Sequence, residues 1–165
     1  PGGEDVNEHL ARKYGGTPEQ FEQNRAAIRA RGAAVGFEFN PAGRGRIYNT
    51  FNAHRLLHWA GLQGDDQQLA LRRALLEAYH GRSEAVEQDD VLLAAVKKAG
   101  LDEARAQEIL ASDEFAAEVR SAERHYQQAG ISSVPAVIIN DRHLISGGQP
   151  PEVFEQALRQ LAQSV

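Results

Sequence analysis

The sequence predicts a mixed α/β fold in which a mostly helical body precedes a β-hairpin and one last helix. Two observations carry this prediction. Up to Gly130 the chain is a series of amphipathic segments with capping residues at their starts and glycines at their ends. After Gly130 two short apolar runs, 136–139 and 143–145, flank Asn140 and Asp141, a pair typical of a tight hairpin turn. A length of 165 residues suits one domain, or one domain with a large insertion.

The first helices are predicted from their ends. A helix over 6–13 ends before two glycines, and Thr17 then offers an N-cap, with Pro18 at the first helical position and Gln20 completing a capping box. Apolar residues seven apart predict an apolar stripe along this second helix, which runs to Gly36: Phe21, Ile28 and Val35. An extended segment over 37–40 and a loop over 41–46 follow.

Further helices are predicted by the same signals. We expect Thr50 to cap a helix that runs to Gly61, followed by helices over 67–80, from 89 or 90 to 100, from Asp102 to 110, and from 112 to 130. The inward-facing residues of these helices include Leu57, Leu71, Leu75, Leu76, Leu92, Val96, Ile109, Phe115 and Val119. A last amphipathic helix follows Pro150 and Pro151.

Composition excludes several classes of function. The chain is 42% apolar and 25% charged, which is ordinary for a globular protein, and no run approaches the roughly 20 apolar residues of a membrane span. A net charge of −5 offers no basic face for nucleic acid. We therefore expect no nucleic-acid partner and no membrane partner. The absence of cysteine excludes disulfides, thiolate metal sites and a cysteine nucleophile within these residues.

The most informative segment is the strand that opens on Val134 and Pro135. Proline has no N–H for a strand ladder, so at this place it belongs to a sheet edge, a bulge or the first position of a strand. It is also the residue type that makes a cis peptide bond accessible. This segment, 130–140, is one of three stretches that together suggest a family.

The three stretches are NTFNAHRLL at 49–57, GISSVPAVIIN at 130–140 and SGGQPPEVF at 146–154. In this order, with 4–17 before them, they resemble the DsbA-like thioredoxin-fold oxidoreductases, in particular the FrnE-like branch near 2-hydroxychromene-2-carboxylate isomerase. Because that branch is cytoplasmic, the resemblance implies a cytoplasmic location. The resemblance implies a thioredoxin-like fold with a large helical insertion. It divides the chain into a helical insertion over 4–129 and the C-terminal part of the thioredoxin-like domain over 130–165.

The resemblance also implies a site that is only partly present. Members of the family begin with a β-α-β unit that carries Cys-x-x-Cys, and neither is found in this sequence, so we expect an N-terminal segment to be missing and no catalytic residue to lie in this chain. Val134 and Pro135, joined by a cis bond, are the implied substrate-binding residues. The backbone of Val134 would pair with an extended peptide by strand addition.

Three functions stay open from the sequence. The first is a thiol–disulfide oxidoreductase that acts on a thiol or disulfide protein or a small thiol, with no cofactor, inactive as the chain stands. The second is a glutathione-dependent isomerase or transferase of the same fold, with Asn49 and Thr50 near glutathione. The third is a non-enzymatic peptide-binding module.

The strand edge at 134–140 also bears on the oligomeric state. Because the edge is uncovered, we predict either a homodimer that pairs through it or a poorly ordered hairpin.

Other polar residues on the helix after Asn49 have less specific roles. Asn49 and Thr50 are first of all a helix cap. His54 and His58 are four residues apart and could share a metal, but no third ligand follows at a recognisable interval, so no metal site is predicted. We expect His54 to make a buried or half-buried polar contact beneath the active face, and His58 and Trp59 to take part in helix packing.

Overall fold

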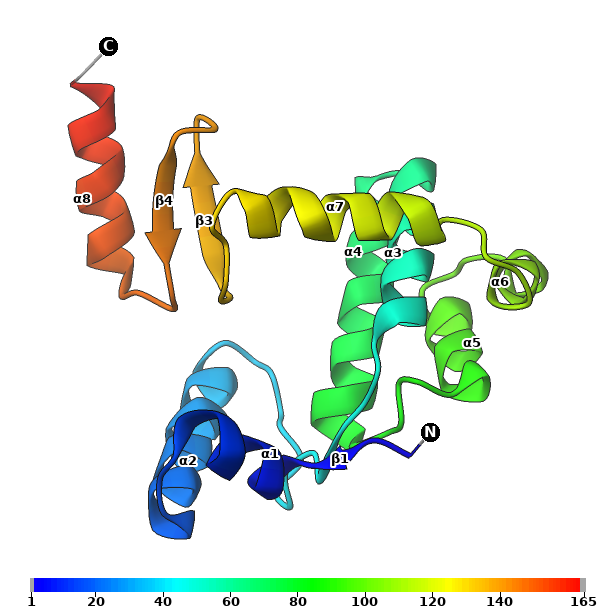
Figure 1. Ribbon diagram of the computed structural model, residues 1–165, viewed down its shortest axis with the longest axis horizontal. Helices are drawn as coiled ribbons and strands as arrows, with labels where there is room; N and C mark the ends of the chain where they lie inside the picture. Colours follow the sequence, from blue (N-terminus) through cyan, green and yellow to red (C-terminus); the bar gives the residue numbers. More distant parts are fainter. Residues whose placement is uncertain (1, 164–165) are drawn as a thin grey trace. The chain divides into compact units, whose positions relative to one another are not determined.

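The computed structural model describes residues 2–163, which form two compact units that divide within α7, one up to Val119 and one from Arg120. Each unit is described by itself. The elements of the first unit, drawn from blue to green in Figure 1, are β1 (Glu4–Asp5), α1 (Val6–Tyr14), α2 (Pro18–Ala34), β2 (Arg46–Ile47), α3 (Phe51–Gln63), α4 (Asp65–Leu76), the π-helical turn η1 (Glu77–Gly81), α5 (Asp89–Lys98) and α6 (Glu103–Leu110). They are followed by α7 (Ala116–Gln128), β3 (Ala136–Ile139), β4 (His143–Ser146) and α8 (Pro151–Ala162).

In three helices of the first unit the residue at the N-cap position caps the helix with its own side chain. The Asp5 carboxylate accepts hydrogen bonds from the N–H groups of Asn7 and Glu8 at the start of α1. Thr17 and Gln20 form the predicted capping box of α2, and Asp102 caps α6. Each such cap is worth about 1 kcal/mol, because it satisfies N–H groups that the helix itself leaves unpaired. The antiparallel pair β1–β2 then joins the start of the chain to the segment before α3.

The core of the first unit lies among four helices. Helix α3 packs against α4 and α6, while α5 packs against both α4 and α6 (Figure 1). Each of the four helices contributes at least one large, fully buried side chain: Leu56, Leu71, Leu92 and Ile109. Burying each of these side chains contributes roughly 1.5–3 kcal/mol. No helix within residues 2–163 combines the length and the apolar character that crossing a membrane requires.

A buried charge ties this core to the chain that leaves it. Arg55 on α3 is 3% exposed. Its guanidinium donates hydrogen bonds to the carbonyl oxygens of Ile109, Ser112 and Glu114, the last at 2.8 Å, and to the side chain of Asn52 at 3.0 Å. The carbonyls lie at the end of α6 and in the turn that follows. Arg55 therefore fixes the path of the chain from α6 to α7.

This arrangement corrects the predicted start of α7. The sequence predicted a helix from 112, but α7 begins at Ala116, and Phe115 just before it has a left-handed backbone with φ of 62°. Two carbonyls of this turn point to Arg55, and the Ser112 hydroxyl accepts a hydrogen bond from the Glu114 N–H. The turn wraps around the guanidinium, so its backbone cannot also begin a helix.

Val35 lies outside α2, contrary to the prediction, and Leu76 does not face inward as predicted. Val35 is 81% exposed, because α2 ends at Ala34 and Val35 lies past the last helical residue. Leu76 is 43% exposed, whereas Leu71 and Leu75 are buried. Residues 71 and 75 share one face of α4, and residue 76 is rotated from residue 75 by about 100°.

The second unit contains the predicted hairpin. Strands β3 and β4 pair antiparallel, with Ala136 opposite Ser146 and Ile139 opposite His143. Asn140 and Asp141 both have positive φ, 52° and 55°, as a two-residue type I′ turn requires. Helix α8 follows as predicted, but it has no buried residue among those the structure describes. The second unit therefore has much less buried apolar surface than the first.

Replacing Arg55 tests its structural role. We expect Arg55→Ala to lower the free energy of unfolding of the helical core by roughly 3 kcal/mol or more, because three carbonyls lose a charged donor in a buried place. Arg55→Lys should be intermediate, since an ammonium group cannot span carbonyls as a guanidinium does. Urea unfolding followed by the fluorescence of Trp59, the single tryptophan and a core residue, measures both changes.

Arg72→Ala on the exposed face of α4 is the matched control, with an expected change within about 0.5 kcal/mol. Equal stability of the Arg55→Ala and Arg72→Ala variants would show that the carbonyl contacts do not stabilise the core.

Candidate functional site

The segment before β3 presents unpaired backbone. The Val134–Pro135 peptide bond is cis, and the Val134 side chain is 86% exposed. The N–H groups of Ser132, Ser133 and Val134 form no hydrogen bond with any residue in the described part of the chain. The Pro135 carbonyl accepts a hydrogen bond from Gly147 N–H at 2.8 Å, which ties this segment to the end of β4. A donor at Val134 is thus exposed on an anchored segment.

The strand that follows has a free edge. Within residues 2–163, β3 and β4 form a sheet of two strands, so β3 has a hydrogen-bonded neighbour on one side only. Several apolar side chains around this hairpin are exposed: Val137, Ile138 and Leu144 on the strands, and Val153 and Leu158 on α8. An open edge of this kind is a template for an added strand.

The polar residues predicted beside the site lie in the first unit. Asn49 is exposed, and its side-chain oxygen accepts a hydrogen bond from the Phe51 N–H at 2.9 Å. Thr50 occupies the N-cap position of α3 but makes no capping hydrogen bond with its side chain. The cap that the sequence assigned to Thr50 is therefore supplied by Asn49, because Thr50 has φ of −100° and ψ of 11° instead of the extended backbone of a capping residue.

The predicted burial of His54 is wrong. His54 is exposed, and the buried polar side chain of this helix is its neighbour Arg55. The adjacent residue lies about 100° around the helix, so only one of the two can face the core. Trp59 is buried as predicted, and the His58 ring lies 5.2 Å from that of Phe115. Residues 2–163 hold no group of three His, Cys, Asp or Glu side chains that could bind a metal ion.

The sequence did not identify a second cluster of polar residues around His80. Its ring lies 4.7 Å from that of Tyr79 and 5.8 Å from that of Phe39. The Arg44 guanidinium lies over Tyr79, 5.5 Å from the ring centre. Burial, and then the positive charge of Arg44, lower the pKa of His80 below its usual value. The structural sign of this cluster is the π-helical turn η1, a feature that is frequent at functional sites. The sequence offers no local signal for a π-helical turn.

Comparison with known proteins identifies the family. A family model described as the DSBA-like thioredoxin domain matches residues 3–159. The chain belongs to the DsbA-like thioredoxin family. The thioredoxin-like DsbA fold and its mostly helical content are therefore confirmed. The matched range includes Asn49, Thr50, Val134 and Pro135.

A solved structure agrees with this assignment. The crystal structure of a probable DsbA oxidoreductase from Streptomyces coelicolor is similar to this DsbA-like chain, with a TM-score of 0.85 and 32% sequence identity. The similarity covers 95% of this chain and 67% of that one. No curated protein matches the chain.

The environment of His80 gives a testable titration. In an NMR titration of the imidazole C–H signals, we expect the midpoint for His80 to lie below 6.5, because burial and Arg44 disfavour the charged ring. Arg44→Gln should raise this pKa but leave it below 6.5, since burial is the larger cause. The unfolded chain then binds more protons below pH 6.5, so this group favours folding above that pH and its contribution falls as the pH falls.

A His80 midpoint at or above 6.5, or no response to Arg44→Gln, would contradict this description of the His80 environment.

Proposed function

We propose that this DsbA-like chain carries the substrate-holding part of a thiol–disulfide oxidoreductase, in which Val134 and Pro135 hold the backbone of a disulfide or thiol substrate. The observation that supports it most directly is the exposed, unpaired backbone at Val134 beside the open edge of β3. The substrate class is a protein with thiols or disulfides, or a small thiol.

Strand addition explains how this segment would hold a substrate. An extended peptide that donates to and accepts from an edge strand gains about 0.5–1.5 kcal/mol for each hydrogen bond. Main-chain pairing of this kind is independent of sequence, which suits an enzyme that acts on many proteins. The exposed apolar residues next to the edge, Val137 and Ile138, add contacts for side chains of the substrate.

The redox step requires a cysteine that these 165 residues do not contain. In thiol–disulfide exchange, a thiolate attacks one sulfur of a disulfide, forms a mixed disulfide and releases the other sulfur as a thiolate. A second thiolate then attacks the mixed disulfide and releases the substrate. The chain alone is accordingly expected to bind substrate without turnover.

The branch of the family and the cellular location are also proposals. The stretches 49–57, 130–140 and 146–154 support an FrnE-like, cytoplasmic oxidoreductase, a branch near 2-hydroxychromene-2-carboxylate isomerase. No cofactor is required for this reaction. The free edge of β3 supports association of two copies as a homodimer, which stays a prediction.

Peptide binding tests the role of Val134. We expect an extended unstructured peptide to bind the chain, with backbone shifts at 132–139 in ¹H–¹⁵N spectra. Val134→Pro removes the N–H donor and should weaken binding about tenfold, the equivalent of one hydrogen bond of roughly 1.4 kcal/mol. Val134→Ala keeps the donor and serves as the matched control, with little expected change. Equal weakening by both variants would show that the backbone of Val134 is not the contact.

A second candidate function is a glutathione-dependent isomerase or transferase. The observation that favours it is the Thr50 hydroxyl, which makes no capping hydrogen bond and lies beside the exposed Asn49. In this alternative glutathione is the cofactor and these two residues contact it. A non-enzymatic peptide-binding module is the third candidate, supported by the same β3 edge and by the absence of cysteine.

Two assays on the full-length gene product separate these functions. The oxidoreductase proposal predicts that it reduces insulin disulfides in the presence of a thiol reductant. The alternative predicts instead saturable glutathione binding that Thr50→Val weakens, because valine keeps the shape of threonine and lacks its hydroxyl. Peptide binding without either activity would leave the binding module. Absence of insulin reduction by a product with an intact Cys-x-x-Cys would exclude the first function.

A further inference from the structure

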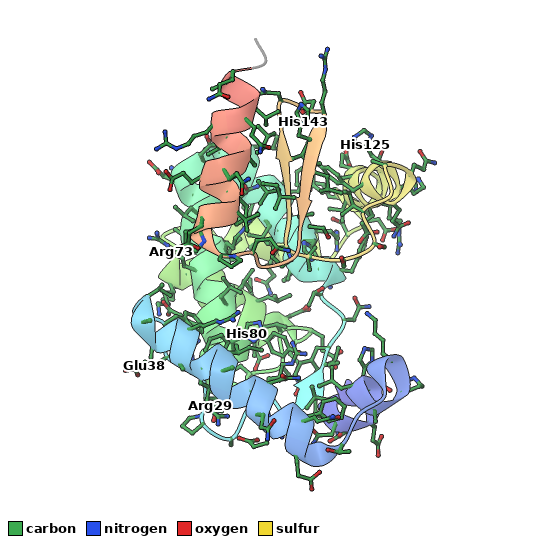
Figure 2. All side chains as sticks on the ribbon, turned by 90° about the vertical axis from the view of Figure 1, so that its left-hand side faces the viewer. Arg29, Glu38, Arg73, His80, His125 and His143 are labelled. Carbon is green, nitrogen blue, oxygen red and sulfur yellow. The ribbon has the colours of Figure 1, made fainter. Side chains whose placement is uncertain are left out.

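A groove of about 830 Å³ lies within the first unit, between α1, α2, the loop 39–45 and the end of η1. Figure 2 labels two of the side chains that line it, Arg29 on α2 and His80 on η1. Its volume is that of a site for a small molecule. All of its lining residues belong to the first unit, so the groove does not depend on the hairpin or on α8.

Apolar side chains form a continuous part of the lining. Phe21 and Ile28 lie seven residues apart on one face of α2, Leu10 comes from α1, and Phe39 comes from the loop. Ile28 is 52% exposed, which is costly for an aliphatic side chain unless something covers it. Two of the three residues of the apolar stripe that the sequence predicts, Phe21 and Ile28, therefore line this groove.

The loop wall of the groove is fixed by hydrogen bonds. The Asn40 N–H donates to the His80 carbonyl at 2.9 Å, and the Ser83 hydroxyl donates to the Gly43 carbonyl at 2.7 Å. The Val6 N–H donates to the Gly45 carbonyl at 3.0 Å. Gly43 and Gly45 have φ of 77° and 68°, a backbone that favours glycine. The groove is thus formed before any ligand binds.

The arginines that line the groove differ in whether they have an acidic partner. Arg25 and Arg29 both form ion pairs with Glu22, at 2.9 and 2.8 Å, and Arg25 also donates to Asn7. Arg44, in contrast, forms no ion pair with any residue the structure describes; its guanidinium lies over the Tyr79 ring and also interacts with the Tyr79 hydroxyl. The His80 ring lies against the rings of Tyr79 and Phe39. One half-buried cation beside a neutral imidazole is left available.

We propose that this groove binds a small amphipathic anion, a carboxylate with a short apolar body. The carboxylate pairs with Arg44 next to His80, and the apolar body covers Phe21, Ile28 and Phe39. This goes beyond the proposed function, because it assigns a small-molecule site to the helical unit. Charge complementarity selects the anion, because a guanidinium that has no carboxylate partner of its own can donate two parallel hydrogen bonds to the carboxylate of a ligand.

Octanoate is the probe for this site. We expect it to bind the full-length protein in isothermal titration calorimetry, with a dissociation constant in the micromolar to low millimolar range typical of a ligand of about ten heavy atoms. Octylammonium has the same apolar body and the opposite charge, so it should bind at least tenfold more weakly. Shifts in ¹H–¹⁵N spectra should map to α2, to 39–45 and to His80.

Two substitutions measure separately how much the charge and the apolar lining contribute to the affinity for octanoate. Arg44→Gln should weaken octanoate binding roughly 10- to 100-fold, the loss expected for charge-assisted hydrogen bonds. Ile28→Ser should weaken it about threefold to tenfold through lost apolar contact. Arg72→Gln, an exposed arginine on α4 outside the groove, is the matched control and should not change the affinity. The fluorescence of Trp59 checks that each variant keeps its helical core.

Three results would overturn the proposal: no octanoate binding, equal binding of octanoate and octylammonium, or shifts confined to the exposed apolar residues of the hairpin and α8. An Arg44→Gln variant that is folded and binds octanoate normally would do the same. Because peptide binding at Val134 is measured independently, failure of this site leaves the proposed oxidoreductase function untouched.

Discussion

The buried guanidinium of Arg55 is the contact on which the helical unit depends. It satisfies carbonyls at the end of α6 and in the following turn, and so determines where α7 begins. A charge that is 3% exposed is stable only where its donors have acceptors. Here the acceptors are three backbone carbonyl oxygens and the side-chain oxygen of Asn52, with no carboxylate among them. The same contact joins residues more than 50 positions apart, so it depends on the packing of α3 against α6.

The two units differ in what stabilises them. The first unit has fully buried side chains on four helices, whereas α8 has none among its described residues and the hairpin leaves several apolar side chains exposed. A two-stranded hairpin by itself is only marginally stable in water. Its exposed apolar residues and its open strand edge are the properties of a surface that binds other chains, which agrees with the substrate-holding role proposed for Val134.

Local signals in the sequence identified most elements correctly. The capping box at Thr17, the Asp102 cap and the Asn140–Asp141 turn involve residues at most three apart, so the sequence alone contains the whole interaction. The errors occur where a distant contact decides. The start of α7 depends on Arg55, and the exposure of Ile28 depends on which elements face α2.

The sequence by itself determined the family, through three ordered stretches, and with it the thioredoxin-like fold and the segment around Pro135. It also determined that no thiol chemistry can arise within these residues, because they contain no cysteine. Only the tertiary structure decided that Arg55, and not His54, is buried, and that Arg44, Phe39 and His80 meet in one groove. The physical reason is that burial and pairing depend on elements far apart in the chain, whereas caps, turns and motifs are contained in neighbouring residues.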